Sequence, residues 1–210
     1  MKQLFFLVSF FIFNLTAASA VHLKGYYIST ANDTVKTVFV VPVYINEDED
    51  SIPDIEAIQT GLKYLDASGK KQKLKPEMAR ELVFQINGHN IKLVHFNINN
   101  AASTQNYIFI EQLKQGKVNL FRYYKSYSNV VSGTGSFQGR SAQIPKYLIE
   151  KKPENPFLLE SSAFAKKMAA YFSNYSDLAL AISNKTLKYN DIEKIVDTYN
   201  EAYRQGWLKN

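Results

Sequence analysis

Residues 34–45 read TVKTVFVVPVYI, a run rich in valine, isoleucine and aromatic residues, which favour β-strands. Residues 38–41 are consecutively apolar, so we expect both faces of this strand to be covered and the strand to lie centrally in a sheet. Pro42 cannot donate a ladder hydrogen bond, which indicates a bulge or an edge at that position.

The same kind of sequence continues on both sides of this run, from Leu23 to about Phe157. Short β-branched and aromatic segments alternate with Asn, Asp, Gly and Pro, as in successive antiparallel strands. Turns are expected at residues 31–33, 68–69, 87–88, 115–116 and 153–155. The sequence therefore predicts about eight to ten strands in consecutive hairpins, an antiparallel β meander that forms a curved sheet or a partly closed barrel.

After Glu160 the apolar residues adopt a helical spacing. Ser161 or Ser162 is expected to cap a first helix, and Asn190 with Glu193 forms a capping-box pattern for a third. The apolar faces of the three expected helices consist of Phe164, Met168, Tyr171 and Phe172; Leu178 and Ile182; and Ile192, Ile195, Val196 and Tyr199.

These patterns together predict an α+β chain. We expect residues 21–160 to form the antiparallel β body and residues 161–210 to form a C-terminal three-helix cap. Each helix is short and amphipathic, so it needs a partner surface, and we expect the cap to pack on the same domain as the sheet.

Residues 1–20 have the three parts of a secretory signal peptide. Lys2 provides the positive end, residues 4–13 the apolar core, and residues 18–20, Ala-Ser-Ala, the small residues of a cleavage site. The apolar run has about half of the roughly twenty residues that span a bilayer. We expect cleavage after Ala20 and a protein that is periplasmic or extracellular, with membrane contact only through the signal peptide before cleavage.

The composition excludes several kinds of bond and partner for this protein. The chain of 210 residues has no cysteine, which excludes disulfides and thiol catalysis. The net charge is +6, and it falls to +5 when Lys2 is removed with the signal peptide. Because this excess is modest and the protein is expected outside the cytoplasm, we expect no nucleic-acid partner.

Two segments carry a resemblance to a known family. The segment GYYISTANDTVKTVFVV, residues 25–41, and the segment YFSNYSDLALAISNKTLKYNDIEKIVDTYN, residues 171–200, resemble small exported proteins of Gram-negative bacteria. These proteins share a GYxI..NDT strand and turn and a helical end with IV..YN. The resemblance covers about a third of the chain, and Thr37 stands where relatives often have glycine. It implies export and a β-rich body with a helical tail, and it supplies no catalytic residue.

One acidic segment is a candidate calcium loop. Asn46, Asp48, Asp50 and Asp54 alternate in NEDEDSIPDIEA like the oxygen ligands of such a loop. A serine replaces the turn glycine and an alanine replaces the bidentate glutamate, so a solvated acidic loop is the alternative. Apart from this weak candidate we expect no metal.

The run LFRYYKSY provides a candidate recognition surface. Phe121, Tyr123 and Tyr127 share one face of the expected strand, and Arg122 and Tyr124 share the other. Burial in a core explains one of these faces. The second face, with Arg122 and Tyr124, is the candidate for binding a sugar or a peptide.

The remaining motifs do not identify an enzyme or a cofactor. The loop GTGSFQGRS, residues 133–141, is one residue too long for a phosphate loop and has Arg140 in place of its lysine. HExxH and GxSxG are absent from the sequence. We therefore expect no cofactor.

The function expected from these features is that of an exported, non-catalytic binding or accessory module of the cell envelope, whose partner is an envelope protein or a glycan. The alternative is an envelope hydrolase that draws its acid and base from the acidic loop and His89 or His95. A third interpretation uses the basic residues 70–75 against anionic lipid head groups. The oligomeric state stays open.

Overall fold

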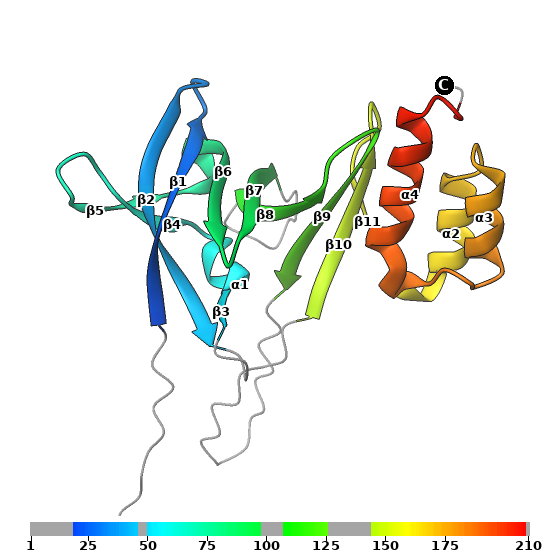
Figure 1. Ribbon diagram of the computed structural model, residues 1–210, viewed down its shortest axis with the longest axis horizontal. Coiled ribbons are helices and arrows are strands. Elements are labelled where there is room, and N and C mark those ends of the chain that lie inside the picture. Colours follow the sequence, from blue (N-terminus) through cyan, green and yellow to red (C-terminus); the bar gives the residue numbers. More distant parts are fainter. Residues whose placement is uncertain (1–18, 46–49, 98–106, 126–143, 209–210) are drawn as a thin grey trace, which may run out of the picture.

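The computed structural model describes residues 19–45, 50–97, 107–125 and 144–208. They form an α+β fold in which a large antiparallel sheet is followed by helices at the C-terminal end (Figure 1). The sheet path begins at one edge strand and ends at another, so the sheet is open and the partly closed barrel is wrong.

The described strands are β1 (Ser19–Ser29), β2 (Thr34–Ile45), β3 (Ser51–Pro53), β4 (Leu62–Leu65), β5 (Lys71–Leu74), β6 (Ala79–Ile86), β7 (His89–Asn97), β8 (Tyr107–Lys114), β9 (Val118–Lys125), β10 (Ile144–Lys151) and β11 (Phe157–Leu158). The α-helices are α1 (Ile55–Ile58), α2 (Phe164–Tyr171), α3 (Ser176–Ser183) and α4 (Ile192–Arg204). Short 3₁₀ turns occupy Pro76–Met78, Ser161–Ala163 and Tyr189–Asp191.

The expected three helices are therefore corrected to four α-helices in the described residues, of which α2, α3 and α4 follow the sheet. The additional helix, α1, lies between β3 and β4 and has four residues, too few to show a helical period in the sequence. The expected caps are also wrong. The 3₁₀ turns precede α2 and α4, and the backbone N–H of Lys188 donates to the Asp191 carboxylate at 2.8 Å where a box between Asn190 and Glu193 was expected.

The strand order is β11-β10-β9-β8-β7-β6-β1-β2-β4-β5, and β3 pairs with β2. Strands β6 to β11 follow one another as a meander, but β1 lies between β2 and β6, which a simple meander does not have. Gly25 of β1 pairs with Thr37 of β2 and Phe84 of β6. A Cβ at Gly25 would overlap the carbonyl oxygen of Val83 and lie 2.9 Å from the Phe39 ring, so this crossing requires glycine.

Strand β2 is central, as its sequence predicts. Phe39, Val40 and Val41 are buried. On one edge β2 pairs with β1, while β4 pairs with residues 38–40 and β3 with residues 43–45. Pro42 lies in the gap between these last two partners, where its missing N–H costs little, and its carbonyl accepts from the N–H of Asp54 at 2.9 Å.

The expected turns are confirmed. Asn32, Gly69, Asn87 and Gly88 all have positive φ values, and they lie between β1 and β2, β4 and β5, and β6 and β7. The turns at residues 115–116 and 153–155 also separate strands, β8 from β9 and β10 from β11. These last two turns lie at the same end of the sheet.

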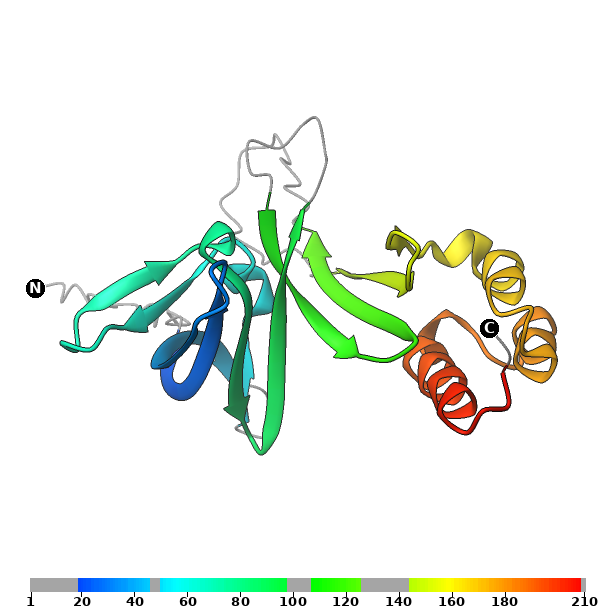
Figure 2. The ribbon, with the colours of Figure 1, turned by 90° about the horizontal axis from the view of Figure 1, so that it is seen from above.

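Two large buried clusters share this sheet. The N-terminal core consists of Phe39, Val41, Val43, Ile55, Ile58, Leu62, Leu74, Ala79, Leu82, Phe84, Ile86, Leu93 and Phe109. The C-terminal core consists of Val118, Leu120, Ile149, Leu159, Phe164, Met168, Phe172, Leu178, Ile182, Ile192, Ile195, Val196, Tyr199, Ala202 and Leu208. Helices α2, α3 and α4 thus pack on β9 and β10, at the opposite end of an elongated molecule from the β4–β5 hairpin (Figures 1 and 2), whereas α1 belongs to the N-terminal core.

Strands β8 and β9 join the two cores. Their pairing runs from Glu111 opposite Arg122 to Lys114 opposite Leu120, with an irregularity in register. Beyond this short ladder the two strands separate, and side-chain amides take the place of a strand neighbour. Gln59, just after α1, bonds the N–H and C=O of Tyr124 at 2.6 and 2.8 Å, and Asn200 of α4 bonds those of Val118 at 2.9 and 2.8 Å.

Candidate functional site

The two residues of the candidate recognition surface lie near the junction of the cores. The Arg122 guanidinium donates to Glu111 Oε2 from Nε at 2.9 Å and from Nη2 at 2.7 Å. Burial by itself would lower the pKa of Arg122, but the adjacent Glu111 carboxylate outweighs it and the pKa is raised. Tyr124 packs against the N-terminal core, and its burial raises the pKa of its phenol. A role for Arg122 and Tyr124 in ligand binding stays a prediction.

The candidate calcium ligands are only partly described. Asn46 and Asp48 lie outside the described residues, and Asp50 is exposed. Asp54 caps α1, since its Oδ1 accepts from the N–H of Ala57 at 3.1 Å. In the described ranges no three acidic or histidine side chains form a group that could hold a metal ion.

The histidines that the hydrolase alternative would use have separate surroundings. His89 is exposed at the start of β7. The Nδ1 of His95 lies 3.2 Å from the carbonyl oxygen of Pro76, and its ring stacks on Tyr107 with centroids 4.9 Å apart. The glycine-rich loop at residues 133–141 lies outside the described residues.

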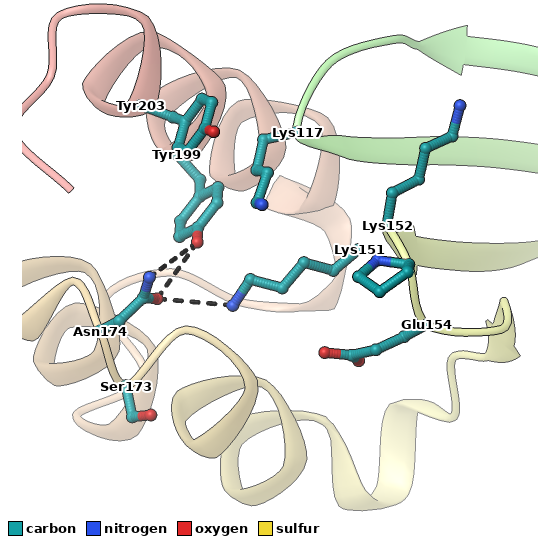
Figure 3. Close-up of a pocket in the computed structure, with 9 residues that line it drawn as sticks. Lys117, Lys151, Lys152, Glu154, Ser173, Asn174, Tyr199 and Tyr203 are labelled. Atoms are coloured by element: carbon teal, nitrogen blue, oxygen red, sulfur yellow. Dashed lines mark hydrogen bonds between the residues drawn. The ribbon is translucent and has the colours of Figure 1, made fainter. Parts of the chain in front are cut away.

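The structure brings together a set of residues that the sequence patterns did not single out. A cavity of about 370 Å³ lies where the turns β8–β9, β10–β11 and α2–α3 meet α4, and it is large enough for a small ligand (Figure 3). Its lining consists of Lys117, Lys151, Lys152, Pro153, Glu154, Ser173, Asn174, Tyr199 and Tyr203. We call this cavity the lysine–tyrosine pocket.

Lys151 is held in place between helices and sheet. It is the last residue of β10, and its Nζ donates to the carbonyl oxygen of Tyr171 at 3.1 Å and, at the longer distance of 3.5 Å, to Asn174 Oδ1. The same ammonium lies 5.2 Å from the ring centroid of Tyr171 and 5.1 Å from that of Tyr199. Two aromatic faces and a carbonyl oxygen therefore fix this positive charge at the pocket.

The inner wall of the pocket combines an amide with a phenol. Asn174 contacts the Tyr199 hydroxyl through Nδ2 at 2.9 Å and through Oδ1 at 3.2 Å. Tyr199 itself is a buried member of the C-terminal core. Core packing thus determines where this hydroxyl lies.

A second positive charge comes from the turn before the neighbouring strand β9. Lys117 precedes β9, and its Nζ lies 5.1 Å from the ring centroid of Tyr203, one turn of α4 after Tyr199. The ammonium groups of Lys117 and Lys151 face the same space, whereas the side chain of Lys152 points away from them (Figure 3). The Glu154 carboxylate enters this space from the β10–β11 turn (Figure 3).

Tyr171 lies behind Lys151 and keeps its proton. Its burial, followed by the negative charge of Glu154, raises the pKa of its hydroxyl. The hydroxyl is buried and has no hydrogen-bond partner within the described part of the chain. Its ring supports the Lys151 ammonium, and Tyr171 is not among the residues that line the pocket.

A signal for part of this pocket was present in the sequence. In a meander, alternate turns lie at the same end of the sheet, and the turns at residues 115–116 and 153–155 are both next to lysines. Val118 pairs with Lys151, which places Lys117 beside the β10–β11 turn. Asn174 lies in the α2–α3 turn and Tyr199 on α4, and the packing of these helices on the sheet has no local signature, so their position at the pocket could not be predicted.

A second described cavity is small and apolar. It has a volume of about 60 Å³ and is lined by Phe96, Ile108, Ile110, Tyr123 and Leu148. This space is far below the size of a small-molecule site. None of the described residues that line it has a charged side chain, so we do not consider it as a functional site.

None of the helices in the described ranges is long and apolar enough to span a membrane. We found no match to this chain among protein-family models, curated proteins or solved structures. The family resemblance of residues 25–41 and 171–200 therefore stays a prediction, and the functional argument rests on the geometry of the pocket.

Proposed function

We propose that this protein is an exported, non-catalytic binding module of the cell envelope, and that the lysine–tyrosine pocket binds an anionic oxygen group, a phosphate or a carboxylate, of its ligand. The observation that carries the proposal is the convergence of the Lys117 and Lys151 ammonium groups on one cavity of about 370 Å³ (Figure 3). Two ammonium groups attract an anion, and hydrogen bonds to charged groups are the strong ones.

The donors around these lysines suit an oxyanion. An ammonium carries three N–H donors, and the hydrogen bonds of Lys151 within the described residues use two of them, one at a long distance. The Asn174 amide, the Tyr199 hydroxyl and the Ser173 side chain line the same cavity. Of these groups the Tyr199 hydroxyl is fixed by the buried ring on α4, and it is bonded to the Asn174 amide of the α2–α3 turn, so a ligand need not order this pair on binding.

No observation favours the hydrolase alternative. Among the described residues that line the pocket Glu154 is the sole carboxylate, and none is a histidine. The hydrolase alternative takes its acid and base from the acidic loop and His89 or His95, and none of these residues that the structure describes lines the pocket. The hydrolase stays an untested alternative, and the binding module is the function that this geometry supports best.

The test is a titration of the ¹⁵N-labelled mature protein with inorganic phosphate, acetate and, as a neutral probe, N-acetylglucosamine. We expect phosphate or acetate to shift the amide signals of Lys117, Ser173 and Asn174 in a saturable way. Lys117→Gln should weaken this binding, while Lys73→Gln on the exposed face of β5 should not. If neither anion shifts these signals, the proposal is wrong.

A further inference from the structure

The lysine–tyrosine pocket holds a negative charge as well as positive ones. Glu154 belongs to the β10–β11 turn, and its backbone N–H donates to the Lys151 carbonyl at 2.8 Å, which fixes the turn relative to Lys151. Its carboxylate points into the space that the Lys117 and Lys151 ammonium groups face (Figure 3). No ion pair or side-chain hydrogen bond engages this carboxylate within the described residues.

The aromatic rings around the pocket are already in contact with lysines. Lys151 lies over Tyr171 and Tyr199, and Lys117 lies over Tyr203. A cation of the ligand therefore finds these ring faces covered by protein cations, which would repel it. Among the described residues that line the pocket, Glu154 is the one with a negatively charged side chain.

A purely anionic ligand would use only one side of this arrangement. It would pair with Lys117 and Lys151 but would be repelled by the Glu154 carboxylate. A ligand that also carries an ammonium group would pair with both sides. The two signs of charge, held around one cavity, thus discriminate between ligands of the same anionic group.

From this charge arrangement we propose that the pocket selects a zwitterionic ligand, in which an anionic oxygen group lies against Lys117 and Lys151 and a primary ammonium group lies against Glu154. The inference rests on the proposed function, because it requires the anion to bind between the lysines. Amino-alcohol phosphates have this chemistry, either as free molecules or as the head groups of lipids.

The experiment compares O-phosphoethanolamine with ethyl phosphate, which has the same anionic group and no amine, by calorimetry on the mature protein. We expect O-phosphoethanolamine to bind about threefold more tightly or better, the effect of one solvent-accessible ion pair. Glu154→Gln should abolish this preference and leave the affinity for ethyl phosphate equal or improved. Glu160→Gln, which changes an exposed carboxylate that pairs with Lys167, serves as the matched control.

The outcomes separate this inference from the proposed function. Equal affinities for the two phosphates would contradict the preference for a zwitterionic ligand but not the anion site. No binding of either phosphate would contradict both the zwitterion preference and the proposed anion site. A preference for the amine that survives Glu154→Gln would overturn the role of Glu154. If the preference depends on Glu154, competition by vesicles of phosphatidylethanolamine identifies a lipid head group, and a lack of competition identifies a soluble ligand.

Discussion

At the scale of single residues, the amide of Asn200 completes the edge of β9 where β8 no longer pairs with it. It bonds both the N–H and the C=O of Val118, and it is 7 % exposed. Gly116 makes this approach possible, since a Cβ there would lie 2.6 Å from the amide carbon of Asn200. The Asn200 side chain thus takes the place of the ligand or water that would otherwise bond the N–H and C=O of Val118.

We predict that Asn200→Ala lowers the free energy of unfolding by about 3 kcal/mol, because two buried backbone groups lose their partners at roughly 1–3 kcal/mol each. Urea denaturation measures this change. Asn190→Ala, at an exposed position next to the same helix, should stay within about 0.5 kcal/mol of the wild type. Similar losses in the two variants would show that the contact with Val118 contributes nothing.

The limits of sequence reasoning are visible in these same residues. Tyr199 was predicted to lie on the apolar face of a helix, and it is buried. This prediction was possible because the spacing of apolar residues along a helix can be read from neighbouring residues in the sequence. The neighbouring Asn200 has no such signal, since its partner Val118 lies 82 residues away. Lys117 and Lys151 meet through the pairing of β9 with β10, which the predicted meander favours, whereas the places of Asn174 and Tyr199 at the same pocket have no signal in the sequence.

At the scale of elements, the β4–β5 hairpin is organised by the Asp66 carboxylate. Its Oδ1 accepts from the Ser68 hydroxyl at 2.6 Å and from the backbone N–H groups of Ser68 and Lys70 at 3.0 Å, and its Oδ2 accepts from Gln72 Nε2 at 2.9 Å. The bonds from Ser68 and then Gln72 lower the pKa of Asp66 from its ordinary value of 3.8 to about 2.

This shift predicts an acid dependence of stability. A carboxylate whose pKa is lower in the folded state stabilises the fold above its unfolded pKa of 3.8, and this contribution is lost as the pH falls toward about 2. Asp66→Asn should therefore be less stable than the wild type at neutral pH, with the difference narrowing over this window. Urea midpoints against pH measure it, with the exposed Asp177→Asn as control. A constant difference down to pH 2 would contradict the assignment.

Hairpins were predictable where strand pairing was not. Asn87 and Gly88 mark their turn because positive φ at both positions selects these residue types. The insertion of β1 between β2 and β6 brings Gly25 opposite Phe84, about sixty residues away, and no local pattern encodes such a contact. The sequence therefore predicted an antiparallel sheet but did not predict the order of the strands in it.

At the scale of the whole molecule, the predicted cleavage after Ala20 is compatible with the sheet. It would remove Ser19 and Ala20 from β1, which pair with Val43 and Pro42, and keep the ladder from Val21 opposite Val41 onward. We predict that the protein expressed in a Gram-negative host is recovered outside the cytoplasm with Val21 as its first residue. Fractionation and N-terminal sequencing check this, and cytoplasmic material that retains Met1 would contradict it.

The two cores meet at the short β8–β9 ladder, and this raises the question of whether they unfold together. The Glu111–Arg122 pair spans β8 and β9 at 2.7 Å, and the buried Gln59 links α1 to both strands, since its carbonyl accepts from Phe109 N–H at 2.9 Å and its amide bonds Tyr124. Buried cross-links of this kind make separation costly, because each would expose or strand polar groups.

We therefore predict one cooperative transition. Phe39→Ala in the N-terminal core and Phe172→Ala in the C-terminal core should each cost about 3–5 kcal/mol, because both rings are fully buried. Trp207, the one tryptophan of the chain, is exposed, but it is held at the end of α4, where its N–H donates to the carbonyl oxygen of Ala202 at 3.0 Å, so its fluorescence follows that end of the molecule. If the cores are coupled, Phe39→Ala lowers the urea midpoint seen by Trp207 fluorescence as much as the midpoint seen by circular dichroism. An unmoved Trp207 midpoint would instead show that the C-terminal core unfolds independently and that the β8–β9 junction is a boundary between two folding units.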